Sequence, residues 1–513
     1  MTDWTSGYVA DIGYTYGYYA ELNPLRVRLA FLNAGLVAPE VGTACELGFG
    51  QGLSANIHAA ATITKWFGTD FNPSQAGFAQ ELAKVSGSDA QLFDEAFLDF
   101  SSRSDLPNFD YIGLHGIWSW ISEENRTLIV EFIRRKLKVG GVLYVSYNTL
   151  PGWAAFAPMR HLMTEHAEII GAEGRGIITR INDAIDFAEK LLTSNPLFSR
   201  ANPLVGERIK KLKEQNRHYL AHEYFNRDWH PMHFSTMAQW LGPSKVQYAC
   251  SANYLDHIDV INITNEQATF LKEIPDPMFR QSVRDFIVNQ QFRKDYWVKG
   301  ARTLSPVEQS ERIRSERLLL ASQRGGIDLK ISGALGEATL SESVYAPILD
   351  LMADYRVREI REIEREISDK GINFAQLVQA VIVLSGAGHL VSVQSDEIIR
   401  KARKHTEALN TFLKSRARGS GDVAFLASPV TGGGITVSRF QQLFLSALDS
   451  GKKHETEVGA HAWEVLASQG QRLIKDGKTL ETAEENRGEL SLQAKDFIES
   501  SLPVFRALHI AET

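Results

Sequence analysis

Short apolar runs alternate with amphipathic helical patterns along the first 150 residues of the chain. This alternation is typical of an α/β fold built on a parallel sheet. The helix before the last strand is expected to start after Ser122, whose hydroxyl can cap it, and to stop at Gly140-Gly141. The apolar runs predict strands at 43–47, 64–71, 91–97, 109–115 and 142–147.

The pattern changes after Trp153. Residues 154–225 are predicted to be helical, with charged faces and no strand. A helix at 234–241 follows, and then two strand-like runs at 245–252 and 257–264 that could pair and close the sheet. We therefore interpret 154–225 as a helical insertion into the first domain. It is expected beside the carboxyl ends of the strands, where ligands bind in open α/β sheets.

The chain beyond residue 265 is predicted to be mostly helical. A charged helical pattern at 356–370, an apolar helix at 373–385 and a short ribbon at 386–393 resemble a winged helix. The apolar helix contains no Lys or Arg, so it is unsuited to nucleic-acid phosphates and better suited to packing or protein docking. The expected domains are a core at 1–265 with the insertion, a helical middle segment at 266–325, a winged-helix-like module at 326–415, and a C-terminal α/β or helical domain at 416–513.

Composition excludes several classes of protein. Hydrophobic residues make up 44% of the 513 residues and charged residues 23%, as in ordinary globular proteins. The net charge of −7 provides no basic field for nucleic acid. Two cysteines are too few for a disulfide framework. No secretory signal and no membrane-spanning stretch is recognised, so a cytoplasmic protein is expected.

A glycine-rich turn is the strongest chemical signal. The strand at 43–47 runs into Glu46-Leu-Gly48-Phe49-Gly50-Gln-Gly52, and then a helix begins. Glycine is needed where backbone approaches a ligand closely or φ is positive. An acid just before the glycines would repel a pyrophosphate. A second acid, Asp70, ends the next strand at the spacing expected of a ribose-binding carboxylate.

A third acid, Asp99, follows the next apolar run. Acids at three successive strand ends suit a ligand with an amino group, ribose hydroxyls and an adenine amine but no phosphate. A nicotinamide-type turn or a purely structural turn is the alternative.

Glu-x-Gly-x-Gly-x-Gly with Asp70 resembles the class I S-adenosylmethionine-dependent methyltransferases. The resemblance implies a Rossmann-like sheet and S-adenosylmethionine as cofactor. It places Gly48, Gly50 and Gly52 close to the cofactor and gives Glu46 the amino-acid end. Asp70 would take the ribose hydroxyls and Asp99 with Phe100 would border the adenine. The full set of expected cofactor contacts is Glu46, Gly48, Phe49, Gly50, Gly52, Asp70, Phe71, Asp99, Phe100 and His115.

Three further segments, at 115–122, 146–153 and 222–234, are similar to bacterial methyltransferases that carry a methyltransferase regulatory domain, here at about 222–300. That group includes lysine methyltransferases acting on outer-membrane proteins. The resemblance implies a protein substrate and a homodimer. From the charge and the lack of a membrane-spanning stretch, neither nucleic acid nor a membrane is expected as a partner. The segment from Tyr14 to Pro24 departs from those lysine enzymes, which leaves the substrate open.

Methyl transfer from a sulfonium depends on alignment of the acceptor and exclusion of water. The strand ends carrying His115, Tyr147 and Asn148 are expected to meet the transferred methyl. Aromatic side chains could wall the cavity through cation–π contacts, or serve only in packing. These candidate substrate-binding residues are Tyr14, Tyr16, Tyr18, Trp118, Trp120 and Trp153. His115 could equally be a core histidine, and no metal is expected at His222, His230 and His233, which lack helical i, i+4 spacing.

The leading hypothesis is therefore a methyltransferase that modifies lysine amines of a protein. An alternative keeps the reaction but transfers the methyl to a hydroxyl or amine of a small metabolite or surface glycan, because fold does not decide substrate. A second alternative is a regulatory protein that binds the cofactor without catalysis.

Overall fold

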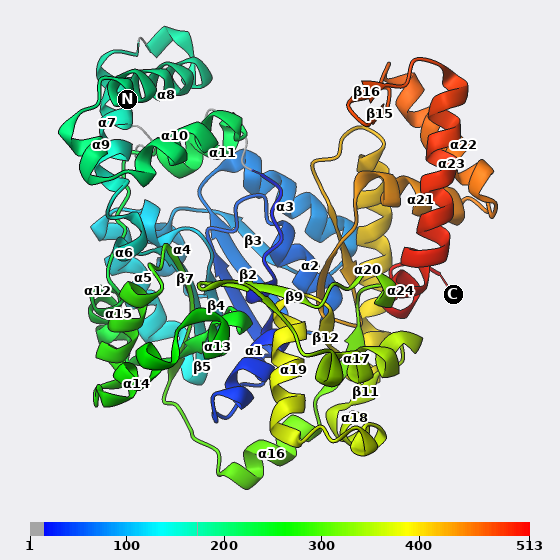
Figure 1. The fold of residues 1–513 in the computed structure, drawn as a ribbon, viewed down its shortest axis with the longest axis horizontal. Coiled ribbons are helices and arrows are strands. Elements are labelled where there is room, and N and C mark those ends of the chain that lie inside the picture. Colours follow the sequence, from blue (N-terminus) through cyan, green and yellow to red (C-terminus); the bar gives the residue numbers. More distant parts are fainter. Residues whose placement is uncertain (1–14, 172, 513) are drawn as a thin grey trace.

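The computed structural model describes residues 15–171 and 173–512. Its centre is a seven-stranded sheet in the order β3-β2-β1-β4-β5-β7-β6, and β7 runs antiparallel to both of its neighbours (Figure 1). The strands are β1 (Thr43–Leu47), β2 (Lys65–Asp70), β3 (Gln91–Asp94), β4 (Phe109–Leu114), β5 (Leu137–Asn148), β6 (Val246–Ser251) and β7 (Phe292–Lys299). The predicted α/β fold with a mostly parallel sheet is confirmed.

Different helices cover the two faces of this sheet. The helices of the core are α1 (Pro24–Asn33), α2 (Leu53–Ala61), α3 (Pro73–Ser86), α4 (Phe97–Ser102), α5 (Glu123–Lys136) and α12 (Phe234–Leu241). Helix α1 packs on the face that carries Tyr111 and Tyr144. Helices α5 and α12 cover the opposite face, where Leu143 and Val145 are buried. The alternation of side chains along β5 therefore decides which residues face which layer.

Helix α5 begins as the sequence indicates and ends differently. The Ser122 hydroxyl accepts a hydrogen bond from the Asn125 amide and caps the helix. Gly140 and Gly141 do not stop it, because β5 already starts at Leu137 and both glycines lie inside the strand.

One predicted strand is wrong. The run at 257–264 forms a 3-10 turn and the short helix α13 (Asp259–Asn262). The strand that pairs with β6 is β7, at 292–299, inside the segment expected to be helical. The expected boundary at residue 265 therefore falls before the last strand of the sheet.

The insertion is helical throughout its described residues and forms a lobe at the upper left of Figure 1. Its helices are α6 (Leu150–Trp153), α7 (Ala157–Ile169), α8 (Ile177–Thr193), α9 (Leu197–Ala201), α10 (Leu204–Glu214) and α11 (Arg217–Tyr224). Met163, Ile181, Ile209 and Leu220 belong to a hydrophobic core of its own. The lobe leaves the sheet directly after the carboxyl end of β5.

The middle of the chain is a set of helices with short strands. It comprises α14 (Asn265–Glu273), α15 (Pro277–Ile287), α16 (Pro306–Arg314), β8 (Arg317–Leu320), β9 (Lys330–Gly333), β10 (Gly336–Thr339), α17 (Glu342–Leu351), β11 (Arg358–Glu359), α18 (Ile360–Glu366), α19 (Phe374–Gly386) and β12 (Leu390–Ser392). The ribbon expected within 386–393 is not formed. Instead β12 pairs with β8, which lies between β11 and β12.

The C-terminal part, at the right of Figure 1, shares a hydrophobic core with helices α2 and α3 of the sheet domain. Leu53 and Ile57 of α2 pack with Leu409 and Leu426. The elements are α20 (Asp396–Ala417), β13 (Phe425–Ser428), β14 (Gly433–Thr436), α21 (Arg439–Asp449), α22 (Glu455–Ser468), β15 (Ile474–Lys475), β16 (Lys478–Thr479), α23 (Ala483–Asp496) and α24 (Leu502–Ala507). Over the part of the chain that is described, no helix has the length and apolar character needed to cross a bilayer.

Candidate active site

The glycine turn between β1 and α2 needs its glycines for geometric reasons. Gly48, Gly50 and Gly52 have φ values of 69°, 58° and 67°, which side chains rarely adopt. A Cβ on Gly48 would lie 2.3 Å from Cδ1 of Ile117, and a Cβ on Gly52 would lie 2.4 Å from Cβ of Ala79. The turn therefore holds the backbone close against the segment that follows β4.

Asp70, at the end of β2, stabilises this turn through hydrogen bonds to its carboxylate. Its Oδ2 accepts a hydrogen bond from the Gly50 amide at 2.8 Å, and its Oδ1 accepts one from the Asn72 amide at 3.0 Å. Burial raises the pKa of Asp70 to about 6, although both hydrogen bonds oppose the shift. Because the Gly50 amide already has an acceptor, the turn does not offer this donor to a phosphate.

Glu46, on β1, lies close enough to Asp70 for their charges to interact, and its carboxyl group is incompletely satisfied. The region around Glu46, Asp70 and the glycine turn is called the Glu46–Asp70 crevice below. The side chain is 2% exposed, and its Oε2 has no hydrogen-bond partner among the described residues. Burial, together with the negative charge of Asp70, raises the pKa of Glu46 to about 8. A buried carboxyl group is costly unless a cation or donor pairs with it. This is the site's clearest indication that a positively charged group binds here.

The third acid is not where the sequence indicates. Asp99 is exposed in the first turn of α4 rather than at a strand end, because β3 stops at Asp94. Phe100 is buried in the core against Phe93. Asp94 pairs in register with Asp70 and is the acid that ends the strand.

The neighbouring Glu95 was missed by sequence reasoning. Its Oε1 pairs with Arg103 at 2.6 Å, while its buried Oε2 has no partner among the described residues. The signal that could have found it is the pair Asp94-Glu95 itself, which marks the end of the apolar run. Of the two cofactor candidates beside the turn, Phe49 is buried and Phe71 is partly exposed.

His115 follows β4 and is enclosed by aromatic rings. Its Nδ1 is 2.8 Å from the Tyr144 hydroxyl, and the ring of Tyr19 stacks on it with the centroids 3.6 Å apart. Burial lowers the pKa of His115 to about 3, so the imidazole is neutral. The next residue, Gly116, donates its amide to the Ser146 hydroxyl at 2.8 Å.

Of the tyrosines between residues 14 and 19, Tyr16 and Tyr18 pack elsewhere and Tyr19 contacts His115. Tyr16 packs edge-on against Phe78, and Tyr18 packs against Phe425 of the C-terminal part. Tyr19, which was not assigned to the substrate set, is the tyrosine that contacts His115. Tyr14 lies outside the described residues.

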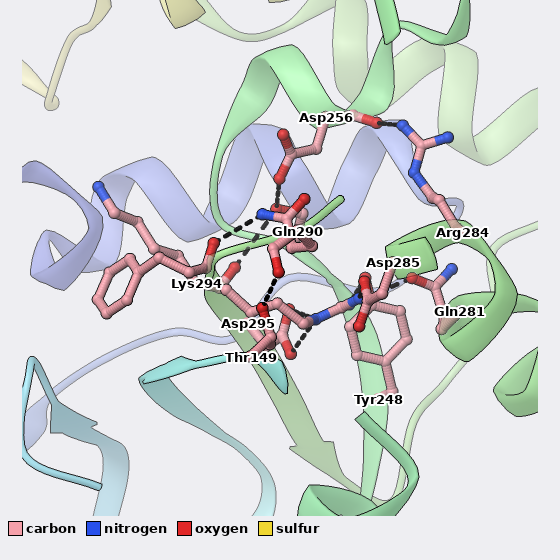
Figure 2. Close-up of polar contacts among 12 residues, drawn as sticks. Thr149, Tyr248, Asp256, Gln281, Arg284, Asp285, Gln290, Lys294 and Asp295 are labelled. Carbon is pink, nitrogen blue, oxygen red and sulfur yellow. Dashed lines mark hydrogen bonds and ion pairs between the residues drawn. The ribbon is translucent and has the colours of Figure 1, made fainter. Parts of the chain in front are cut away.

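Tyr147 does not face the His115 side of the sheet. It belongs to the hydrophobic cluster on the opposite face, and its hydroxyl donates to Asp295 Oδ2 at 2.9 Å. Asp295 in turn binds the Arg293 guanidinium at 2.9 Å, and Asp285 binds it at 2.5 Å (Figure 2). Tyr147 is therefore part of a buried ionic cluster, and its expected contact with the transferred methyl is not supported by this geometry.

Asn148 does end β5 on the same face as Tyr144 and Ser146. Its backbone N–H donates to the Ser119 hydroxyl at 2.8 Å, and its side-chain Oδ1 accepts from Trp153 Nε1 at 3.1 Å. The segments 115–119 and 144–148 are thus joined by hydrogen bonds at three points. Asn148 connects the sheet to the start of the helical insertion.

The three tryptophans have different surroundings. Trp118 is completely buried and packs edge-on against Trp240, so it is a core residue. Trp120 and Trp153 both contact Trp229, and together these rings form a cluster between the sheet and the insertion. The guanidinium carbon of Arg208 lies 3.9 Å from the centroid of the Trp153 ring. Trp120 and Trp153 thus line the junction with the insertion.

The residues of the crevice fit S-adenosylmethionine. The unpartnered carboxyl oxygen of Glu46 suits the ammonium or sulfonium of the cofactor. Asp70 suits ribose hydroxyls, and the positive φ values of the three glycines let the backbone turn tightly beside these two acids. None of these features suits a diphosphate.

Comparisons with known proteins agree with this geometry. Residues 216–299 match the family model described as a predicted methyltransferase regulatory domain. An uncharacterized protein of Synechocystis is 40% identical over 513 residues, which are 99% of this chain and 100% of that protein. An uncharacterized protein of Rickettsia prowazekii is 26% identical over 289 residues, covering 54% of this chain and 49% of the other.

The solved structure of PKMT2 from Rickettsia typhi in complex with AdoHcy matches the fold with a TM-score of 0.68 at 17% identity. The match covers 96% of this chain and 99% of that one. The similarity in fold therefore extends well beyond the central sheet, into the insertion and the C-terminal part.

Proposed function

Since the chain belongs to the class I S-adenosylmethionine-dependent methyltransferases that carry a methyltransferase regulatory domain, we propose that it methylates lysine side chains of a protein. The fold that it shares with PKMT2 along almost its whole length supports this choice of substrate class.

When bound, S-adenosylmethionine supplies a methyl group on a positively charged sulfur. We assign to Glu46 the pairing with the cationic amino-acid end of the cofactor, and to Asp70 the ribose hydroxyls. The pairing of Glu46 with the cofactor is inferred from its buried Oε2, which has no partner in the described chain. The glycines from Gly48 to Gly52 bring the backbone into contact with the cofactor.

The acceptor amine must lose its proton before it attacks, and a pocket that disfavours charge helps it to do so. His115, stacked on Tyr19 and bonded to Tyr144, forms such a pocket, since burial holds the imidazole neutral. We assign to His115 and Asn148 the positioning of the neutral amine. Tyr147 acts through Asp295 as a support of β5.

The surface of the insertion favours a macromolecular acceptor. Four large apolar side chains of this lobe are more than two-thirds exposed, and we take them as contact points for a protein acceptor. They are Ile169, Ile170, Leu197 and Leu204. The lobe starts with α6, directly after the end of β5, so a protein bound near this junction would lie close to the proposed site. The position of this lobe beside the end of β5 is the observation that supports a protein as the methyl acceptor.

We also interpret the succession α17, β11, α18, α19 and β12 as a winged-helix-like module. Its apolar helix α19 is buried along Leu377, Val381 and Leu384, which supports packing rather than nucleic-acid contact.

The test is transfer of radiolabelled methyl from S-adenosylmethionine into a bacterial lysate, which is then separated into protein and small-molecule fractions. We expect label in the protein fraction, on lysine after hydrolysis, and loss of that label with Asp70→Ala. Asp99→Ala, exposed on α4, is the matched control and should retain it. Label confined to small molecules would contradict the lysine proposal and favour a metabolite acceptor.

A further inference from the structure

A cavity of about 470 Å³ lies where three parts of the chain meet. Its walls come from the segment leading into α1, from the region of α19 and β12, and from the β13–β14 hairpin. Tyr18 and Ala20, on either side of the Tyr19 that stacks on His115, belong to the lining. Its volume is in the range of small-molecule sites.

Arg26 provides a cation in this cavity. Its guanidinium lies over the ring of Tyr254, with Cζ 4.0 Å from the centroid. Its Nε is buried without a hydrogen-bond partner, and no carboxylate in residues 15–171 and 173–512 forms an ion pair with it. The acid closest along the chain, Glu21, is bound to Lys294 at 2.6 Å. Arg26 is thus a largely enclosed positive charge that interacts with Glu21 only through space, while the Glu21 carboxylate makes its direct contact with Lys294.

Ser385 provides a second unsatisfied group in the same wall. It is 3% exposed, and its Oγ has no hydrogen-bond partner among the described residues. The described lining contains further hydroxyl and amide groups, for example Asn23 and Ser392, but no Asp or Glu. The wall therefore combines one positive charge with hydrogen-bond donors and has no negative charge.

Such a combination favours an anion. An enclosed guanidinium is stabilised when it pairs, and its planar fork matches the two oxygens of a carboxylate. A single cation balances a single negative charge, which is that of a monocarboxylate rather than a phosphate dianion. Aromatic rings at Tyr18, Tyr254 and Phe425 supply apolar contact for the rest of the ligand.

We propose that this cavity is a binding site for a small monocarboxylate, held by Arg26 and Ser385 and separate from the Glu46–Asp70 crevice. The ligand would join α1 to the middle and C-terminal parts of the chain. It would also contact Tyr18 and Ala20, on either side of Tyr19. Binding of the ligand would therefore affect the position of Tyr19 over His115. The site goes beyond the proposed methyl transfer and does not depend on it.

The test uses the full-length protein and a panel of aliphatic and aromatic monocarboxylates of four to twelve heavy atoms. Each is paired with its neutral primary amide at the same ionic strength, and inorganic phosphate is included. Thermal unfolding is followed by fluorescence, and the strongest binder is titrated calorimetrically. We expect at least one carboxylate to raise Tm by about 2 °C or more at tenfold excess over its Kd, while its amide does not.

Arg26→Met should abolish this shift, and Arg26→Lys should weaken the binding because the fork is lost. Arg403→Met, exposed on α20 and paired only with Glu407, is the matched control and should leave the shift intact. Ser385→Ala tests the site without touching the charge, and about fivefold weaker binding is expected. A shift that survives Arg26→Met, no shift with any carboxylate, or a shift with phosphate alone would overturn the proposal.

Discussion

The ring of Tyr19 stacks on the imidazole of His115 with the centroids 3.6 Å apart and the planes 18° from parallel. Tyr19 is held in turn by α2, because its amide donates to the Ser54 hydroxyl at 2.9 Å. The segment before α1 is thereby placed across the ends of β1 and β4, over the proposed acceptor pocket. Tyr19 therefore covers His115, whereas the neighbouring Tyr16 and Tyr18 pack elsewhere.

Replacing Tyr19 by Ala should lower kcat/KM about tenfold, because it opens the His115 pocket to water. Tyr19→Phe should retain most of the activity, since the stacking ring remains. Tyr16→Ala serves as the control, because Tyr16 packs on Phe78, away from the pocket. Equal losses in Tyr19→Ala and Tyr16→Ala, measured by methyl transfer, would contradict this role.

Asp70→Ala should weaken binding of S-adenosylhomocysteine by about 10- to 100-fold, since a charged acceptor of hydrogen bonds is lost. The variant also frees the Gly50 amide, which Asp70 now holds. Calorimetric titration measures the effect, with Asp99→Ala as the control. If Asp70→Ala binds S-adenosylhomocysteine as tightly as the unaltered protein, Asp70 does not contact the cofactor.

Tyr147→Phe should reduce stability by about 1–2 kcal/mol, because Asp295 loses one of its buried hydrogen-bond donors. Cofactor affinity should not change, since Tyr147 faces away from His115. Thermal unfolding and calorimetric titration separate the two effects. Full stability combined with lost methyl transfer would mean that Tyr147 belongs to the reacting centre after all.

Binding of S-adenosylmethionine should release protons near neutral pH. The pKa of Glu46 is raised to about 8 by burial, so its carboxyl group is mostly protonated at pH 7 before the cofactor binds. A cation beside it favours the ionised form, and the proton leaves. Affinity should therefore rise with pH up to about 8.

Titrations at pH 7 in buffers of different ionisation enthalpy measure this release, which should approach one proton per cofactor. Glu46→Gln should abolish most of it. Proton uptake, or a release unchanged in Glu46→Gln, would show that another group is responsible.

The sequence predicts the parallel part of the fold because its signals are local. The strands that became β1, β2 and β4 are short apolar runs, and Ser122 caps α5 as its position indicates. Glu46 and Asp70 were found because each lies at the end of such a run. Their shared crevice follows from the topology of parallel strands.

Strand β7 could not be found in the same way. Its residues include Arg293 and Asp295, which look exposed in sequence and are buried because they neutralise each other. In the run taken for this strand, Ile258, Ile261 and Ile263 are buried, a spacing that does not alternate. Because Arg293 and Asp295 neutralise each other in three dimensions, a pattern of apolar residues does not reveal β7.

The misplacement of Tyr147 has a simpler cause. Side chains along β5 alternate, so Tyr144, Ser146 and Asn148 share a face that Tyr147 does not. Asp99 was misplaced because β3 is shorter than its apolar run, and α4 takes over the residues after Asp94. The pairing of Tyr19 rather than Tyr16 or Tyr18 with His115 depends on a segment without regular structure, for which no pattern exists.

The central claim is that the Glu46–Asp70 crevice seats a cationic sulfur donor and no diphosphate. Calorimetric titration of the unaltered protein with S-adenosylmethionine, S-adenosylhomocysteine and a nicotinamide dinucleotide tests it most directly. The account predicts that both sulfur compounds bind with one site per chain, that Glu46→Gln weakens them, and that the dinucleotide does not bind. Binding of the dinucleotide, or no heat from either sulfur compound with folded protein, would contradict it.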